Sequence, residues 1–172
     1  MVIADTLVSF GQKFLEFGQY LIQTFGYIGI FLVAFIGTST IILPTFPLSI
    51  LVFFTGSILN PFFVGIAAGL GSATGELIGY GVGIGGKKVL LKKYKKSIER
   101  TEKLFQKYRG EVVIFLIATI PIIPFDVIGL FCGIIGFKWK RFYIAVLLGK
   151  TLRYLIIAFA GFYGLSWLAT YL

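Results

Sequence analysis

The sequence predicts an all-α integral membrane protein arranged as an inverted repeat, and three observations support this fold class. Hydrophobic residues make up 58% of the 172 residues and charged residues only 13%, whereas soluble domains carry about 25% charged residues. Two apolar stretches, 62–84 and 142–163, are long enough to cross a bilayer. A proline-broken apolar stretch precedes each of them, so the same pattern occurs twice. A chain of this size could not hide so much apolar surface from water, and lipid is therefore the expected solvent.

The composition also excludes several classes of function. The chain has no histidine, so neither a histidine metal site nor a Ser-His-Asp triad is available. Its single cysteine, Cys132, cannot form an internal disulfide, and we interpret it as a small buried apolar residue. Because no nucleophile with an evident base is present, we expect a protein that is not an enzyme and that uses no cofactor and no metal.

Most of the positive charge behind the net charge of +9 lies in two segments, 87–110 and 137–141. Basic segments between apolar stretches mark the cytoplasmic side of a membrane protein, and they attract anionic headgroups. We therefore expect a multi-pass protein of the cell membrane, with both segments in the cytoplasm and with membrane lipids rather than nucleic acid as partners. Apolar residues recur every three or four positions in 87–110, which predicts a basic amphipathic connector helix with Gly110 as its C-cap.

We expect a single membrane domain with an N-terminal helix, a first repeat, the connector helix, a second repeat and a tail (1–24, 25–86, 87–110, 111–163 and 164–172). The N-terminal helix is amphipathic, and its charged residues favour a position in the membrane interface over a span. The uncharged tail contains Trp167 and Tyr171, which suit the interface.

Each repeat begins with an apolar stretch that a pair of prolines interrupts, Pro44 and Pro47 in the first and Pro121 and Pro124 in the second. The limb that follows Pro47 has about twelve residues, which rise about 18 Å as a helix and cannot cross a core of about 30 Å. Two short limbs that meet at a proline elbow predict a re-entrant hairpin. Pro47 and Pro124 each begin a second limb, so the positive ends of two short helices would point into the midplane and attract an anion.

The two halves align at a constant offset of 77 residues without a gap. The aligned pairs include Pro44 with Pro121, Pro47 with Pro124, Ser49 with Asp126, Gly56 with Gly133, and Glu76 with Arg153. The basic segments place the start of the first span outside and the start of the second span in the cytoplasm, so the repeats are inverted. Inverted repeats with broken helices are typical of secondary transporters, in which substrate binds where the broken helices meet.

Glycines recur at every fourth position of the first span, at Gly71, Gly75, Gly79 and Gly83. Small residues at this spacing form a smooth stripe that lets two helices approach closely. The stripe packs helices equally well within one chain or between two chains, so a homodimer is compatible with the sequence.

Four ionisable residues fall near mid-membrane depth, namely Glu76, Asp126, Lys150 and Arg153. A charge there costs about 2.5–3.5 kcal/mol on insertion scales, so these residues need a reason to be present. Two interpretations remain open. In the structural one, Glu76 pairs with Arg153 and locks the halves together. In the functional one, Lys150 and Arg153 hold an anion, with phosphate as the best candidate, and Glu76 and Asp126 carry a proton or repel the wrong ligand.

Two further side chains are expected to support this site. Ser49 holds in the first hairpin the place that Asp126 holds in the second. Tyr80 follows Glu76 by one helical turn, so its hydroxyl is expected to hydrogen-bond the Glu76 carboxylate. Ser72 lies on the same face, one turn before Glu76.

The elbows and the charged motifs occur in a fixed order along the chain. The order is Pro44-x-x-Pro47 with Gly56, Gly75-Glu76-Leu77-Ile78-Gly79-Tyr80-Gly81-Val82-Gly83, Pro121-Ile122-Ile123-Pro124-Phe125-Asp126, and Gly149-Lys150-x-x-Arg153-Tyr154. In this order and spacing the motifs resemble the DedA superfamily, also called the VTT or SNARE-associated Golgi protein family. The resemblance covers residues 25–163.

The resemblance implies two facing re-entrant hairpins, ionisable residues inside the membrane and a role in moving lipids between leaflets. Bacterial relatives are linked to recycling of a polyprenyl-phosphate carrier that depends on the proton motive force, and eukaryotic relatives to phospholipid scrambling. Glu76 matches the family's membrane acid, and Asp126 and Arg153 match positions of some branches. Many members carry an arginine shortly before the second elbow, where this chain has Ala118, which leaves Lys150 and Arg153 as the candidate cations.

The function expected from the sequence is translocation of a phosphate-bearing lipid or polyprenyl-phosphate carrier between leaflets, by a flippase-like or scramblase-like mechanism. One alternative is a proton- or ion-coupled secondary transporter of a small solute, which would depend on Glu76 or Asp126. A second alternative is a membrane scaffold that does not transport and whose segment 87–110 binds partners or anionic lipid.

Overall fold

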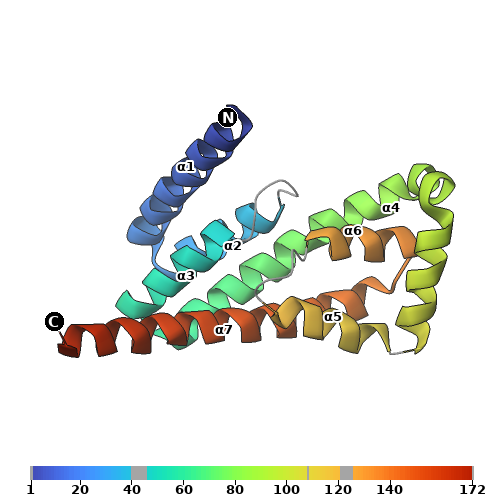
Figure 1. The fold of residues 1–172 in the computed structure, drawn as a ribbon. Coiled ribbons are helices and arrows are strands. Elements are labelled where there is room, and N and C mark those ends of the chain that lie inside the picture. The colour runs from blue at the N-terminus through green and yellow to red at the C-terminus, as the bar shows by residue number, and fades with distance from the viewer. Residues whose placement is uncertain (1, 40–45, 108, 121–125, 172) are drawn as a thin grey trace.

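The computed structural model describes residues 2–39, 46–107, 109–120 and 126–171, and within these ranges it contains α-helices and short turns but no strand. The helices are α1 (Val2–Phe25), α2 (Tyr27–Ser39), α3 (Phe46–Ile58), α4 (Pro61–Lys107), α5 (Gly110–Thr119), α6 (Asp126–Ile135) and α7 (Trp139–Tyr171). The predicted all-α class is confirmed (Figure 1).

Two long helices, α4 and α7, form the centre of the molecule. Their parts Pro61–Lys87 and Trp139–Gly164 are long and apolar enough to cross a membrane, which agrees with the predicted spans 62–84 and 142–163. The two helices are antiparallel, because Gly65 on α4 lies against Leu155 on α7, whereas Thr74, further along α4, lies near Tyr143, close to the start of α7.

Four short helices cover this central pair in a regular way. Helix α2 packs on α4 and α5 packs on α7, so the first short helix of each half lies on the long helix of its own half. Helix α3 packs on α7 and α6 packs on α4, so the second short helix of each half lies on the long helix of the other half. The elbow residues Pro44, Pro121 and Pro124 lie outside the described residues, whereas Pro47 is buried in the first turn of α3, where a helix tolerates proline.

Glycines allow these helices to approach closely. On α4, Gly71 faces the backbone of Phe31 and Gly75 faces that of Phe35, both on α2, whereas Gly83 faces the carbonyl of Leu130 on α6. The predicted glycine stripe therefore makes contacts within the chain and serves two short helices in succession. A methyl group at Gly71 or Gly83 would overlap backbone atoms of the neighbouring helix.

The first span and the predicted connector helix 87–110 belong to one helix, α4, as far as Lys107. Helix α4 continues from Pro61 to Lys107 without an interruption, and Figure 1 shows its ribbon turning sharply in the yellow-green part. The helix persists because Gly85 and Gly86, the only helix-weakening residues there, lower helical stability by only about 1 kcal/mol each and no proline follows.

The predicted C-cap at Gly110 is also wrong. Arg109 takes the left-handed conformation, with φ of 52°, and Gly110 is the first residue of α5. A Cβ at Gly110 would lie 2.7 Å from the rings of both Phe105 and Phe137. Close packing between these two rings, and not backbone conformation, therefore accounts for a glycine here.

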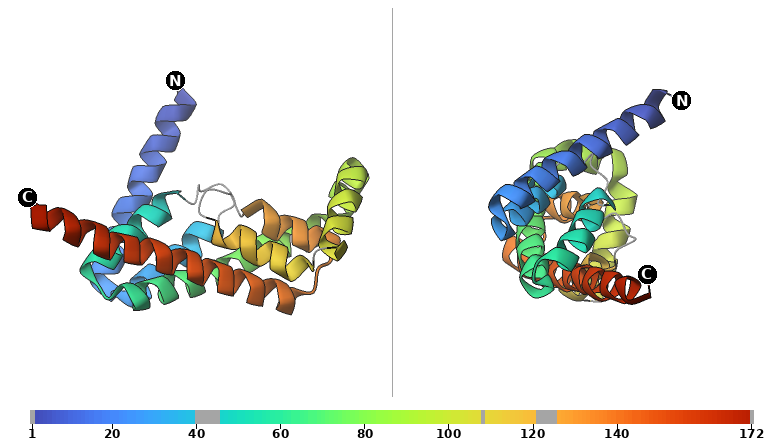
Figure 2. Two further views of the ribbon diagram at one scale, coloured as in Figure 1. Left: turned by 60° about the horizontal axis from the view of Figure 1, so that its bottom comes forward. Right: turned by 90° about the vertical axis from the view of Figure 1, so that its left-hand side faces the viewer.

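The first and the last described residues, Val2 and Tyr171, belong to helices. Helix α1 packs on α2 and α3 through the buried Phe14 and Gly18, and Figures 1 and 2 show its N-terminal end projecting from the other helices. Gly26, with φ of 57°, makes the turn from α1 into α2, a conformation that favours glycine. The segment 164–172, expected to be a separate tail, continues α7 as far as Tyr171.

Buried apolar residues that the structure describes form two clusters. One joins α1, α2 and α3 to the start of α4 and the C-terminal half of α7, and the other joins α5 and α6 to the middle of α4 and the start of α7. Cys132 belongs to the second cluster and is fully buried, as predicted. Buried polar side chains gather where the clusters meet, at Ser72, Glu76, Lys150 and Arg153.

Candidate functional site

A buried ion pair joins the two long helices at the junction of the two clusters. The ammonium Nζ of Lys150 on α7 donates a hydrogen bond of 2.6 Å to Oε1 of Glu76 on α4. The exposed fractions of the two side chains are 0% and 1%, so neither charge is solvated by water in this conformation. Mutual attraction in a medium of low dielectric constant offsets part of the cost of burying these charges.

A second polar contact crosses the same helix pair. The hydroxyl of Ser72, one turn before Glu76, lies 3.5 Å from the hydroxyl of Tyr154, one turn after Lys150. Both side chains are fully buried. The contacts Glu76–Lys150 and Ser72–Tyr154 therefore lie next to each other along the crossing of α4 and α7, one charged and one neutral.

Arg153 adds a second cation to this region. Its side chain is 1% exposed, and its guanidinium carbon lies 5.8 Å from the centre of the Tyr154 ring. Because Arg153 follows Lys150 by three residues, both cations lie on the same side of α7. The structure thus brings together three of the four predicted ionisable residues at the junction between the clusters.

Asp126, the fourth predicted residue, is the first residue of α6, and its side chain lies outside the described residues. Helix α6 nevertheless forms one wall of the site. A Cβ on Gly129, one turn after Asp126, would lie 3.0 Å from Oε2 of Glu76. The start of α6 is therefore packed against the Glu76 carboxylate.

Ser49, the supporting residue in the first hairpin, is half-buried in the first turn of α3. Its helix packs on α7, the helix that carries both cations. This arrangement parallels that of α6, which packs on the helix that carries Glu76.

The predicted hydrogen bond from Tyr80 to Glu76 is wrong. The Tyr80 hydroxyl donates instead to the carbonyl of Phe137, at 2.5 Å, in the turn between α6 and α7. The Tyr80 ring stacks on Phe142 with ring centres 5.1 Å apart. The long side chain of Tyr80 reaches past the site, so this residue fastens α4 to the α6–α7 turn.

Thr38, which the sequence analysis did not single out, contributes to the same layer. Its side chain is 4% exposed, and its hydroxyl lies 3.0 Å from the carbonyl of Ser72 and 2.8 Å from that of Ala34. Gly75 permits this contact, since a Cβ there would overlap the Thr38 hydroxyl. A polar residue at the end of an apolar limb, next to a proline elbow, is the signal that would have identified it.

The arrangement favours recognition of an anion over covalent chemistry. Lys150 offers ammonium donors and Arg153 offers a planar guanidinium, and both groups suit phosphate. Glu76 occupies one donor of Lys150, so an incoming phosphate and the carboxylate would compete for the same ammonium.

One comparison with known proteins gives a match. A family profile described as the VTT domain matches residues 46–163. The match begins at the first residue of α3 and ends in the C-terminal half of α7, so it includes Glu76, Lys150 and Arg153. Neither a curated protein nor a solved structure matches the chain.

Proposed function

Since this chain belongs to the VTT domain family, the DedA/SNARE-associated Golgi family of membrane proteins, we propose that it translocates a phosphate-bearing lipid or polyprenyl-phosphate carrier between leaflets. The observation that carries this proposal is the buried Glu76–Lys150 ion pair, with Arg153 one turn away, at the crossing of the two candidate membrane spans. Charges inside a membrane are costly, and a packed apolar contact would hold two helices together at least as well. A role in function therefore explains the ion pair better than a need to join the helices.

The proposal includes an inverted repeat, and close backbone approaches support it. On α3 and α6, Gly56 faces Ala158 of α7, and Gly133 faces Tyr80 of α4. The glycines are 77 residues apart, as in the sequence alignment, but Tyr80 and Ala158 are 78 apart. The extra residue lies in the connecting turn, which comprises positions 136–138 in the second half and positions 59–60 in the first. The alignment therefore has a gap at this turn.

The offset of 78 between α4 and α7 changes which residue of one helix is equivalent to which residue of the other. At an offset of 78, Glu76 corresponds to Tyr154 rather than to Arg153, and Lys150 corresponds to Ser72. The ion pair Glu76–Lys150 and the hydroxyl contact Ser72–Tyr154 are then the same contact in the two copies of the repeat. A site at the axis that relates two inverted repeats lies near the midplane, at a similar depth from both leaflets, which suits a substrate that changes sides.

In the proposed mechanism, the lipid phosphate replaces the Glu76 carboxylate on Lys150, and Arg153 holds a second phosphate oxygen. We assign to Glu76 the role of proton carrier, which would couple movement of the anion to protons. The apolar tails stay in the bilayer throughout. Because the pair is closed to solvent in this conformation, helices α3 and α6 have to move away from the long helices to admit the headgroup.

The proposed topology follows the charge distribution. We place the chain as a multi-pass protein of the cell membrane, with 87–110 and 137–141 in the cytoplasm and with α2–α3 and α5–α6 as re-entrant hairpins. The short apolar lengths of Tyr27–Ser39, Pro47–Ile58 and Gly110–Thr119 support the hairpins. On this view the protein is a transporter without enzymatic activity, and it uses neither a cofactor nor a metal.

The test is a leaflet-exchange assay with purified protein in liposomes. The liposomes contain a trace of headgroup-labelled phospholipid or labelled polyprenyl phosphate, and a membrane-impermeant quencher reports how much label reaches the outer leaflet. Wild type is expected to expose nearly all the label, and Glu76→Gln and Arg153→Ala are expected to slow its exposure. If wild type matched empty liposomes with both lipids, the proposal would be wrong, and uptake of a small solute or a scaffold role would take its place.

A further inference from the structure

Two apolar grooves lie on the outer faces of the long helices. The first, the α2/α4 groove, has a volume of about 350 Å³ and is lined by Tyr27, Ile28, Phe31, Phe63, Ile66, Ala67 and Leu70. The second, the α5/α7 groove, has a volume of about 300 Å³ and is lined by Glu111, Val112, Phe115, Arg141, Ile144, Ala145 and Leu148. Each groove lies between the long helix of one half and the first short helix of the same half.

The two grooves correspond position by position. The long-helix residues Ile66, Ala67 and Leu70 recur as Ile144, Ala145 and Leu148, and Phe31 of the short helix recurs as Phe115. The backbone agrees, because Gly71 faces the carbonyl of Phe31 and Gly149 faces that of Phe115. The walls are therefore the same apolar surface in both copies.

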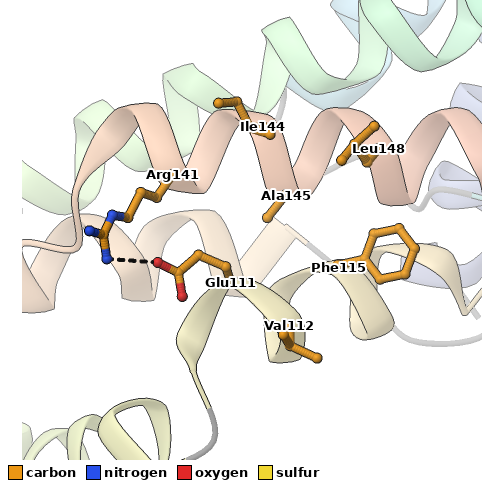
Figure 3. Close-up of a pocket in the computed structure, with 7 residues that line it drawn as sticks. All are labelled: Glu111, Val112, Phe115, Arg141, Ile144, Ala145 and Leu148. Carbon is orange, nitrogen blue, oxygen red and sulfur yellow. Dashed lines mark hydrogen bonds and ion pairs between the residues drawn. The ribbon is translucent and has the colours of Figure 1, made fainter.

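The grooves differ at one end, which we call the mouth. At the mouth of the α2/α4 groove the rings of Tyr27 and Phe63 meet edge to face with centres 5.7 Å apart. At the mouth of the α5/α7 groove Nη1 of Arg141 lies 2.9 Å from Oε1 of Glu111. Figure 3 shows this ion pair at one end of the groove and Phe115 and Leu148 at the other. An aromatic pair in one copy thus corresponds to an ion pair in the other.

The depth of the α5/α7 groove along the membrane span can be estimated. The apolar part of α7 begins at Trp139, so Arg141 lies at the end of the span, and Leu148 lies about 10 Å deeper. Trp139 is 54% exposed, and the ammonium of Lys140 lies 5.7 Å from the centre of its ring. Exposed tryptophan beside lysine is typical of the headgroup level of a bilayer.

We propose that the α5/α7 groove binds one acyl chain of an anionic phospholipid whose phosphate contacts Arg141, and that the α2/α4 groove binds an acyl chain without selecting the headgroup. The apolar walls face the hydrocarbon, and the charged mouth lies at the level of phosphate groups. The side chain of Arg141 is 59% exposed while bonded to Glu111, so guanidinium donors remain accessible to a phosphate.

Charge complementarity favours an anionic lipid over a zwitterionic one. Lys138 and Lys140 are exposed and come shortly before Arg141 in the sequence, whereas Glu111 is the acidic residue that lines this mouth. Glu111 fixes the position of the guanidinium, and the lysines make the segment that leads into the mouth positively charged. The binding proposal does not rest on translocation, since a lipid can occupy the groove whether or not it changes leaflets.

The experiment uses the matched residues Phe31 and Phe115 as reporter positions. In a background of Trp139→Phe and Trp167→Phe, either Phe115→Trp or Phe31→Trp provides a single tryptophan in one groove. The full chain is reconstituted in phosphatidylcholine, and brominated phosphatidylglycerol or brominated phosphatidylcholine is added at increasing fractions. Quenching of the tryptophan then gives the relative affinity of each lipid for that groove.

At the Phe115→Trp reporter, phosphatidylglycerol is expected to bind about three- to tenfold more tightly than phosphatidylcholine, and the preference should fall at high salt. Arg141→Gln should abolish the preference, Arg141→Lys should keep part of it, and Glu111→Gln should keep or increase it. At the Phe31→Trp reporter, both lipids should bind equally. The proposal would be overturned if phosphatidylglycerol and phosphatidylcholine bound equally at both reporters. Weak quenching of Phe115→Trp by both lipids would also overturn it, because a second copy of the chain would then cover the groove.

Discussion

The two halves of the molecule use the same backbone contacts with different side chains. At the crossing of the long helices, Ser72–Tyr154 in one copy corresponds to Glu76–Lys150 in the other. At the groove mouths, an aromatic pair corresponds to the ion pair of Glu111 and Arg141. At the crossing and at the groove mouths, glycines and apolar side chains keep the helices at the same spacing in both halves. In each case the contact of only one half is charged. If the proposed repeat holds, the shared contacts build the scaffold, and the positions at which the halves differ carry the charges of the proposed sites.

The largest expected effect comes from removing one partner of the buried pair. Lys150→Met leaves the Glu76 carboxylate buried without this cation, and breaking such a pair costs about 3–5 kcal/mol of folding stability. The double variant Glu76→Gln/Lys150→Met removes both charges and is expected to recover most of this loss. Wild type, Lys150→Met and the double variant are compared by thermal unfolding of the purified proteins in detergent. The loss of the monodisperse species measures the unfolding. If the double variant were no more stable than Lys150→Met alone, the two charges would not compensate each other.

The next effect concerns the close backbone approaches that the two halves share. Gly56→Ala and Gly133→Ala force a methyl group against the backbone of Ala158 and Tyr80, respectively, and each should cost about 1–3 kcal/mol. Gly81→Ala on α4 is the matched control, because a Cβ there meets no atom within 4 Å and alanine favours a helix. The same unfolding measurement should therefore show losses for the first two and none for the third. Tolerance of Gly133→Ala together with loss at Gly56→Ala would show that the halves are not packed alike.

The neutral contact should matter less than its charged counterpart. Ser72→Ala removes one hydroxyl from a contact 3.5 Å long, and Tyr154→Phe removes the other. Each is expected to lower stability by about 0.5–1.5 kcal/mol, the usual contribution of a neutral hydrogen bond. Their combination should cost little more than either one alone. A loss as large as that of Lys150→Met would mean that the hydroxyl pair, and not the ion pair, holds the crossing together.

The smallest effect is a pH dependence at the groove mouth. The pKa of Glu111 lies below its ordinary value of 4.5, chiefly because its own backbone N–H donates a hydrogen bond to the carboxylate. Burial acts in the opposite direction, and the hydrogen bond and charge of Arg141 lower the pKa further. The stabilisation is fully present above pH 4.5 and is lost as the pH falls through the lower pKa of the folded state. Because the pair is exposed, its contribution should be about 0.2–1 kcal/mol. The stability difference between wild type and Glu111→Gln should shrink below pH 4.5, and a difference that grew with acidity would contradict this sign.

The sequence predicted most of the helices because their signals are local. Prolines, apolar length and charge runs define the two spans and the short limbs on either side of each elbow. The gapless offset of 77 fails by one residue between α4 and α7, because the turn at Gly136 holds one residue more than the turn at Asn60. It fails by seven residues between α2 and α5, where Phe31 and Phe115 make the equivalent contacts, and a gapless alignment can show neither change. The pairing of Glu76 with Lys150 depends on how two helices cross, which the spacing within one helix does not determine. The spacing within α4 likewise predicted a hydrogen bond between Tyr80 and Glu76. The Tyr80 hydroxyl instead reaches Phe137 in the turn between α6 and α7.

The central claim is that the buried pair serves transport rather than folding. The most direct measurement is leaflet exchange of labelled phospholipid and of labelled polyprenyl phosphate by the double variant Glu76→Gln/Lys150→Met, with Ser72→Ala as the control at the same helix crossing. The account predicts a folded double variant that leaves the label in its original leaflet, while Ser72→Ala exchanges it at a rate close to that of wild type. Exchange at the wild-type rate by the double variant would contradict the account and would make the ion pair a structural lock.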